Sequence, residues 1–421
     1  MSNVPDIRFK GFTDAWEQRE FNELLKKDDG VRRGPFGSAL KKEIFVKENE
    51  YVVYEQQNAI YDKYDTRYNI TKEKYEELNK FKVEPGDFIM SGAGTIGRVS
   101  FVPKGIKSGV FNQALIRFRI NNRIMDPLYF LQFLRNERTQ KLLTSTNPGS
   151  AMTNLLPLTE LKKWKVTVPI VEEQKLIGEF LRNYDNTITL LQRELDLENK
   201  TIEMFMDNLF IQKEQNIPCF NLSENTSVWK SVKLKEIGDT FTGLSGKNKD
   251  DFGHGDAWYI TYMNVFSNPI SNFNDKEKIE IDFKQNEVKY GDIFFTTSSE
   301  TPNEVGMSSV WLGDDANIYL NSFCFGFRPK VELDPYFIAY LLRSKKVRLK
   351  ISKLAQGISR YNISKTKMME IEINIPDIKT QNEVGRILKE LHKKKQITEK
   401  QIEKAKIIKK AFLQKLFPKG D

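Results

Sequence analysis

The chain has 421 residues and a net charge of +9, with only two cysteines and two histidines. This length favours two or more domains, and so few cysteines and histidines argue against a disulfide framework or a structural zinc site. The basic charge permits nucleic-acid binding without requiring it. The N-terminal stretch lacks the apolar segment of a signal peptide, and no apolar run is long enough to cross a bilayer. We therefore expect a cytoplasmic protein with no membrane partner.

The first half of the chain predicts a mixed α and β domain that is followed by a long helix. Runs of β-branched and aromatic residues indicate short strands at 51–54, 87–90, 98–102 and 114–120. A helix at 127–144 and a strand at 165–169 are expected next. The long helix, at 171–213, has apolar residues alternately four and three apart, which is a heptad seam broken only by Glu198.

The stretch SGAGTIGRV contains Gly92, Gly94 and Gly97, whose spacing fits the G-x-G-x-x-G fingerprint of dinucleotide-binding proteins. That fingerprint works only where the glycines join a strand to a helix, because the helix N-terminus holds the pyrophosphate. The residues that follow, RVSFVPKGIKSGVF, instead favour a second strand. We therefore predict a tight loop between two strands, and a cofactor-dependent enzyme is kept only as an alternative.

The second half repeats the first in the same order, at an offset of a little over two hundred residues. PGDFIMS is echoed by YGDIFFT, FNQALIRFRI by LNSFCFGFRP, and VPIVEEQKLIGEFL by IPDIKTQNEVGRIL. The glycine fingerprint is not repeated, which favours a variable surface loop on a common frame. The alignment pairs Asn58 with Asn264, Asp87 with Asp292, Asn112 with Asn321, Arg119 with Arg328, Asn154 with Asn362, and Gln174 with Gln381.

A second long helix is expected at 380–417, and its charge is opposite to that of the first. Residues 171–213 carry 9 acidic and 5 basic side chains, whereas residues 389–419 carry 11 Lys and 3 Glu. Opposite charge favours pairing of the two helices, and an antiparallel pair would relate the halves by a pseudo-two-fold axis. The register we expect places Ile177 on Leu416, Leu209 on Val384 and Glu198 on Lys395. The expected pairing residues are Ile188, Leu191, Leu195, Glu198, Ile202, Leu391, Lys395, Ile402 and Ala405.

The order of these segments resembles the specificity subunit of type I DNA restriction-modification systems. The similar stretches are IRFKGFTDAWEQREFNEL, GPFGSALK, GDFIMSGAGTIGRV, FNQALIRFR, GSAMTNL and VPIVEEQKLIGEFL in the first half, and GLSGK, GDAWYITYMNVF and FLQKLF in the second. The resemblance covers essentially the whole chain. It implies an α/β (α+β) fold with target recognition domains at 1–165 and 214–372, separated by helical regions at 166–213 and 373–421 that pair as an antiparallel coiled coil.

The resemblance also implies a function and a set of partners. Such subunits recognise a bipartite, asymmetric site in double-stranded DNA and bind two modification subunits, which methylate adenine N6 with S-adenosylmethionine. Restriction subunits that translocate DNA join them, and ATP and Mg are expected there, so no cofactor or metal is expected on this chain. The sequence agrees that it has no catalytic centre, because neither an amino-methyltransferase tetrapeptide nor a G-x-x-x-x-G-K-S/T phosphate loop is present.

DNA contacts need cations for phosphates, and amide or guanidinium groups for base edges. A basic loop, a strand end and the glycine loop supply these groups in the first domain, and the matching segments supply them in the second. At the strand end, capping of the backbone is an equally good interpretation. The candidates are Arg32, Arg33, Ser38, Lys41, Lys42, Gln56, Gln57, Asn58, Ser91, Thr95 and Arg98, then Ser245, Lys247, Lys249, Asn264, Thr297, Ser298, Arg360 and Tyr361.

Two further interpretations are open at this point. A duplicated DNA-binding protein that acts alone, such as a regulator, would bind its site without partner subunits. A coiled-coil scaffold without DNA function would leave the duplicated globular parts unexplained.

Overall fold

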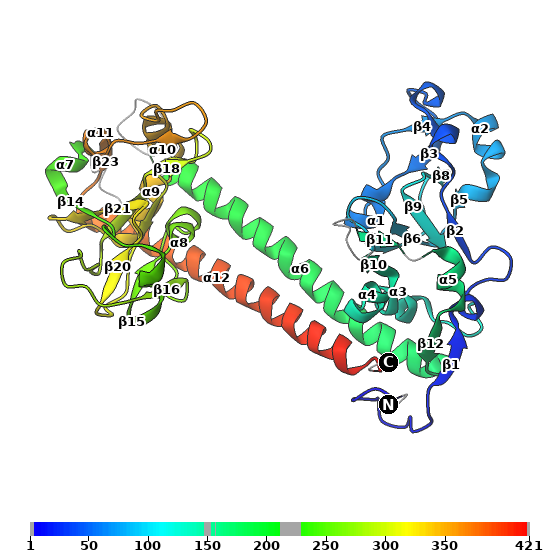
Figure 1. Ribbon diagram of the computed structural model, residues 1–421. Helices are drawn as coiled ribbons and strands as arrows, with labels where there is room; N and C mark the ends of the chain where they lie inside the picture. Colours follow the sequence, from blue (N-terminus) through cyan, green and yellow to red (C-terminus); the bar gives the residue numbers. More distant parts are fainter. Residues whose placement is uncertain (1–3, 147–152, 156, 211–228, 419–421) are drawn as a thin grey trace. The chain divides into compact units, whose positions relative to one another are not determined.

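The computed structural model describes residues 4–146, 153–155, 157–210 and 229–418 (Figure 1). The chain forms two compact units, of which one combines the two ends of the sequence and the other is formed by the middle. Unit 1 comprises Met1–Leu191 and Gln401–Asp421, and unit 2 comprises Gln192–Lys400. Each unit therefore contains part of both long helices.

Unit 1 is built on two four-stranded sheets and a two-stranded ribbon. The first sheet is antiparallel, with the order β2-β9-β6-β7, and the second has the order β4-β3-β8-β5, in which β3 and β8 are parallel. The ribbon pairs β1 with β12, and β10 pairs with β11. The strands are β1 Glu17–Glu20, β2 Val31–Arg33, β3 Tyr51–Tyr54, β4 Asn69–Ile70, β5 Lys82–Val83, β6 Phe88–Ser91, β7 Val99–Phe101, β8 Gly109–Phe111, β9 Leu115–Phe118, β10 Thr144–Thr146, β11 Thr153–Leu155 and β12 Lys165–Val168.

The helix predicted at 127–144 is two helices, because the chain turns at Asn136. Asn136 has an extended backbone, and its side chain accepts from the Arg138 amide and caps the second helix. Its amide group also donates to the Leu413 carbonyl at 3.0 Å, a partner that lies far along the chain. The short helices of unit 1 are α1 Gln56–Tyr61, α2 Lys72–Glu77, α3 Pro127–Arg135, α4 Glu137–Leu143 and α5 Leu158–Lys163, with 3₁₀ turns at Phe21–Leu24, Gly37–Leu40, Lys42–Ile44 and Asn79–Phe81.

Unit 2 repeats this topology with the strands in the same order. Its four-stranded sheet is β14-β21-β17-β19, its second sheet is β16-β15-β20 with β15 and β20 parallel, and its ribbon pairs β13 with β23. The strands are β13 Lys230–Lys233, β14 Gly238–Thr242, β15 Phe252–Ile260, β16 Lys276–Ile279, β17 Ile293–Thr296, β18 Ser298–Ser299, β19 Ser308–Val310, β20 Ile318–Leu320, β21 Cys324–Pro329, β22 Tyr361–Asn362 and β23 Glu372–Ile375. The short helices are α7 Leu234–Ile237, α8 Tyr262–Ser267, α9 Pro335–Leu342, α10 Lys345–Ser352 and α11 Lys365–Met369, with a 3₁₀ turn at Lys249–Asp251. The internal repeat predicted from the sequence is therefore confirmed.

The start of each long helix is tied to its own unit by the same glutamine. The Gln174 side chain accepts from the Asp126 amide and donates to the Pro169 carbonyl. The Gln381 side chain makes the matching bonds to Asp334 and Pro376. Both glutamines are buried, so these bonds fix the angle at which the helix leaves the sheet.

The long helices are α6 Val171–Leu209 and α12 Ile378–Lys415, and they run antiparallel in each unit. In unit 1, the rings of Phe180 and Phe412 lie 4.8 Å apart, and the Lys409 ammonium lies 2.6 Å from the Asp185 carboxylate. In unit 2, the Leu209 and Val384 side chains share one hydrophobic core. Ile202, Ile402 and Ala405 are buried, and Ile188, Leu191, Leu195 and Leu391 are half-buried.

One polar contact of the expected register is wrong. The buried Glu198 carboxylate accepts from the Thr398 hydroxyl at 3.1 Å and lies 3.5 Å from the Lys394 ammonium, not on Lys395. Lys395 instead lies 3.8 Å from Glu399 on its own helix. The heptad pattern predicted the pairing face correctly. The long side chain of Lys394, one residue before the expected Lys395, is the one that reaches the Glu198 carboxylate.

Candidate nucleic-acid interface

In unit 1, the segments predicted to contact DNA meet around the turn Asn112–Gln113–Ala114. The turn is closed by the Asn112 side chain, which accepts from the Ala114 amide at 3.0 Å. The glycine loop is bonded to it, because the Gly92 amide donates to the Ala114 carbonyl at 2.7 Å. The basic loop starts at Gly34, where a Cβ atom would lie 1.9 Å from the Asn112 carbonyl oxygen. Only glycine permits this close approach of the two backbones.

Unit 2 has the same arrangement around Asn321–Ser322–Phe323. The Asn321 side chain accepts from the Phe323 amide at 2.8 Å, and the Thr297 amide donates to the Phe323 carbonyl at 3.0 Å. The early loop starts at Gly243, where a Cβ atom would lie 2.1 Å from the Asn321 carbonyl oxygen. The two units therefore hold their candidate loops with the same set of backbone contacts.

A short helix lies against the loop in both units. In unit 1, the Gln56 side chain at the start of α1 reaches the Ala93 carbonyl at 3.5 Å. In unit 2, the Tyr262 hydroxyl at the start of α8 donates to the Ser298 carbonyl at 2.6 Å. Burial raises the pKa of Tyr262, so this side chain stays a neutral hydrogen-bond donor. The aligned positions therefore make the same contact with different side chains.

The glycine loop joins two antiparallel strands, β6 and β7, as predicted. Gly94 and Gly97 have positive φ angles of 63° and 83°. The Gly97 amide donates back to the Ser91 carbonyl, which closes the loop on itself. The segment therefore lacks the helix N-terminus on which a dinucleotide site depends.

Several residues that were predicted to contact DNA are buried, and they hold the backbone in place instead of facing the surface. The Asn58 amide group donates to the Lys63 and Asp65 carbonyls, while its oxygen accepts from the Glu55 amide. In unit 2, the Asn264 amide group likewise donates to two carbonyls, those of Asn272 and Asp275, while its oxygen accepts from the Asn272 amide. Buried amides saturated in this way cannot reach a base edge, so the backbone-capping interpretation holds for both asparagines.

Ser91 is likewise buried, and its hydroxyl bonds to the Thr95 carbonyl and the Arg98 amide. Ser298 is buried in β18, and the Thr297 hydroxyl donates to the Phe323 carbonyl at 2.8 Å. Lys247 is held by Asp282 at 2.8 Å and is only 14% exposed. These four residues are therefore better explained as supports of the loops.

The remaining predicted residues lie at the surface or near it. Arg33, Lys41, Lys42, Thr95, Arg98, Ser245, Lys249 and Arg360 are exposed, and Gln56, Gln57 and Tyr361 are half-buried. The side chain of Ser38 lies outside the described residues. Exposed cations around a closely packed turn are suited to phosphate contact.

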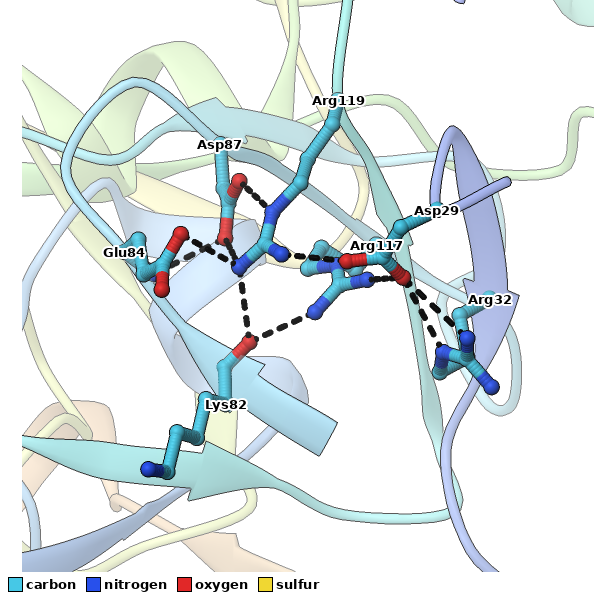
Figure 2. Close-up of polar contacts among 7 residues, drawn as sticks. All are labelled: Asp29, Arg32, Lys82, Glu84, Asp87, Arg117 and Arg119. Carbon is cyan, nitrogen blue, oxygen red and sulfur yellow. Dashed lines mark hydrogen bonds and ion pairs between the residues drawn. The ribbon is translucent and has the colours of Figure 1, made fainter. Parts of the chain in front are cut away.

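Arg32 belongs to an ion network that also contains Asp29, Arg117 and Arg119 (Figure 2). Arg32 lies 3.2 Å from Asp29, and the same carboxylate contacts the guanidinium groups of Arg117 and Arg119. Arg119 also lies 2.6 Å from Asp87. Burial tends to raise the pKa of Asp29, but Arg117 and Arg119 outweigh it and hold the pKa below its ordinary value. Arg33 is exposed and is therefore the arginine of β2 that is expected to face a ligand, while Arg32 stiffens β2.

The two units differ beyond this frame. In unit 1, β11 pairs with β10 next to α4. In unit 2, the equivalent strand β22 pairs with β18, so the hairpin closed by Gln356 and Asn362 lies beside the Thr297 loop. Arg360, Tyr361 and Ile358 belong to this hairpin, and Ile358 is 96% exposed.

The sequence did not point to two exposed positions of the turn itself. Gln113 in unit 1 and Phe323 in unit 2 are exposed, and so is Met263 on α8. The repeat offered a signal, because it aligned Asn112 with Asn321 and so marked a shared turn. The run LNSFCFGFRP reads as a buried strand, and this hid the exposure of its first phenylalanine.

The match to a protein-family model identifies the family of this chain. The family model of the type I restriction modification DNA specificity domain matches residues 14–199 and again residues 226–406. The chain belongs to this family. Its role is therefore DNA sequence recognition within a restriction-modification system. The two matched segments coincide with the two halves of the repeat.

Individual relatives agree with the family. The chain is 23% identical over 417 residues to the putative type I restriction enzyme MjaX specificity subunit of Methanocaldococcus jannaschii, which covers 93% of this chain and 91% of the relative. It is 26% identical over 317 residues to the MjaVIII specificity subunit of the same organism, covering 71% and 72%. The crystal structure of the type I S subunit from M. genitalium shares the fold, with a TM-score of 0.61 at 16% identity and coverage of 99% and 100%.

Two properties of the described residues bear on other classes of function. None of their helices is both long and apolar enough to span a bilayer. Within the same residues, no group of three or more His, Cys, Asp or Glu side chains is placed to hold a metal ion.

Proposed function

We propose that this chain recognises a bipartite, asymmetric site in double-stranded DNA, with each unit reading one half. The observation that carries the proposal is the shared turn. Asn112–Ala114 and Asn321–Phe323 are held by the same hydrogen bonds, yet the side chains around them differ. One frame with two different surfaces suits two different half-sites, because base contacts specify sequence while the frame only positions them.

We further propose that the long helices bind two modification subunits, which methylate adenine N6 with S-adenosylmethionine, and set the spacing of the half-sites. Restriction subunits that use ATP and Mg²⁺ would join this complex. The apolar surface of α6 supports a helical partner. Leu197 and Met204 lie seven residues apart, and they are 65% and 47% exposed. An apolar stripe of this spacing is typical of helix packing. Because the proposed target is cellular DNA, we expect the chain to act in the cytoplasm.

The proposal is tested by co-purification and methylation. The full chain is expressed with the modification subunit of its host, and the complex is incubated with genomic DNA and labelled S-adenosylmethionine. We expect a stable complex and labelled adenine that require both proteins. Leu197→Glu combined with Met204→Glu should abolish the complex, and the fold should be retained because both side chains are exposed. Gln192→Glu, at an exposed residue on a different face of the same helix, serves as the control. Tight specific DNA binding by the chain alone, with no complex, would favour the stand-alone regulator instead.

A further inference from the structure

The surfaces around the two turns carry different side chains at aligned positions. In unit 1, Gln57 follows Gln56 on α1, and Ala114 ends the turn. In unit 2, Met263 stands at the position of Gln57, and Phe323 stands at that of Ala114. The shared hydrogen bonds fix this alignment, since the Gly92–Ala114 bond corresponds to Thr297–Phe323. Unit 2 therefore presents the Met263 thioether where unit 1 presents the Gln57 amide, and a large aromatic side chain where unit 1 has the small methyl group of Ala114.

The apolar residues of unit 2 are presented rigidly and not buried. Phe323 and Met263 are each 57% exposed. The Phe323 carbonyl accepts from both the amide and the hydroxyl of Thr297, at 3.0 and 2.8 Å. Its amide is held by the Asn321 side chain. A large apolar side chain on a fixed backbone loses little conformational freedom when a partner covers it, which favours binding there.

A cation accompanies these apolar groups and points to the kind of partner. Arg360 is exposed on the hairpin that pairs with Ser298 and Ser299. This hairpin is bonded to the loop beside Phe323, because the Ile363 amide donates to the Thr297 carbonyl at 2.9 Å. A guanidinium beside apolar side chains matches a DNA groove, in which phosphates flank the thymine methyl groups.

We propose that unit 2 reads its half-site through contacts of Met263 and Phe323 with thymine C5-methyl groups in the major groove, whereas unit 1 uses the amides of Gln57 and Gln113. This inference rests on the proposed function, because it assumes that each unit reads one half-site. Apolar side chains recognise the thymine methyl group, and glutamine recognises adenine through paired hydrogen bonds. The two half-sites are therefore expected to differ in the chemistry by which they are read.

The test first requires the two half-sites. The full chain, in complex with its modification subunit, is used to select duplexes from a pool with randomised sequence, and the bound DNA is sequenced. Each thymine of the selected site is then replaced singly by deoxyuridine, which removes one methyl group. In the half-site of unit 2, at least one replacement should weaken binding about fourfold, the effect of one buried methyl group. The same replacements in the half-site of unit 1 should leave binding unchanged.

Variants assign the effect to the two residues. Met263→Gln and Phe323→Ala introduce the side chains found at the aligned positions of unit 1, and both sites are exposed, so the fold is expected to be retained. The double variant should bind thymine and deoxyuridine duplexes equally. Leu349→Ala, at a 62% exposed apolar residue on α10, is the matched control and should retain the fourfold difference.

The outcomes separate this inference from the function on which it rests. Deoxyuridine without effect in either half-site, or a double variant that still discriminates, would overturn the methyl contact while leaving site recognition intact. Met263 and Phe323 would then serve as a wedge between base steps or as a protein contact. Failure to select any duplex sequence would contradict the proposed function itself.

Discussion

The Arg119 guanidinium lies 2.6 Å from the Asp87 carboxylate, and Arg328 repeats this contact with Asp292 at 2.8 Å. Both pairs join the strand that follows the shared turn to the strand that precedes the variable loop. The ion pair therefore belongs to the frame that both units keep, while the exposed side chains around it differ.

Removal of the charge from these carboxylates should destabilise the two units unequally. Asp87→Asn keeps an acceptor for the Glu84 amide but removes the most buried carboxylate that Arg119 contacts. Arg119 is 13% exposed, and it is left with the exposed Glu84 and with Asp29, which two other arginines share. We expect a loss of about 3 kcal/mol in the free energy of unfolding. Arg328 is 39% exposed and can reach water, so Asp292→Asn should cost about 1 kcal/mol. Urea unfolding measures both losses.

The control for these variants is Asp239→Asn. Asp239 pairs with Lys330 at a site where both side chains are more than half exposed, and its loss should stay below about 0.5 kcal/mol. If all three variants lose the same stability, burial of the ion pair does not matter to the frame.

Arg98 and Asn58 should separate DNA binding from stability. Arg98 is exposed on the glycine loop, so Arg98→Ala should weaken binding to all duplexes and reduce the salt dependence by about one phosphate contact. Its free energy of unfolding should not change. Asn58→Ala should instead cost about 2 kcal/mol of stability, because it leaves two backbone carbonyls without their donor. A normal salt dependence in Arg98→Ala would remove this residue from the interface.

The helix register predicts a specific cross-link. With Cys219 and Cys324 replaced by alanine, Ile188→Cys and Ala405→Cys should form a disulfide on mild oxidation, since both positions lie on the pairing faces of α6 and α12. Leu190 is 61% exposed, so Leu190→Cys with Ala405→Cys should stay reduced. Gel mobility with and without reductant distinguishes the two. Cross-linking of the control pair alone would mean a different register.

His392 should make unit 2 sensitive to acid. Burial lowers its pKa to about 4, and the charge of Lys395 acts in the same direction. The ring packs against Tyr340, whose hydroxyl lies 2.9 Å from Nδ1, while Nε2 lies 3.0 Å from Gln396. The unfolded chain binds the proton near pH 6.5, so between the two pKa values it holds more protons than the folded chain. Stability is therefore lost as the pH falls below about 6.5.

Between pH 8 and pH 5 this histidine should account for a loss of about 2 kcal/mol in the free energy of unfolding. Urea unfolding at both pH values gives that loss for the wild type, and His392→Gln should lose about 2 kcal/mol less over the same interval. The other histidine, His254, is exposed, so His254→Gln should follow the wild type. Identical losses in all three proteins would contradict the role of His392.

Local patterns predicted much of the frame from the sequence. The strand at Tyr51–Tyr54 lies where its β-rich run indicated, and the glycine loop joins two strands as its flanks predicted. The helix at 127–144 was predicted too long, because Asn136 ends it with a bond to the distant Leu413 carbonyl. A bond between residues so far apart in the chain leaves no trace in local periodicity.

The candidate site was harder to predict. The type of a residue shows whether its side chain could contact DNA, but it does not show whether the fold places that side chain at the surface. Asn58 and Arg98 both carry groups suited to DNA, but only the fold shows that one is buried among carbonyls and the other is exposed. Phe323 lies in an apolar run, so its sequence favours burial, whereas the turn at Asn321 places it at the surface.

The most direct measurement is a base-resolution adenine methylome of cells that express this chain with its modification subunit, against cells that lack the chain. Recognition of one half-site by each unit predicts a new split, asymmetric motif with N6-methyladenine in both halves. A variant of Gln57 and Gln113 in unit 1 should relax only the half read by that unit. A continuous motif, or no new motif despite a stable complex of the two proteins, would contradict the account.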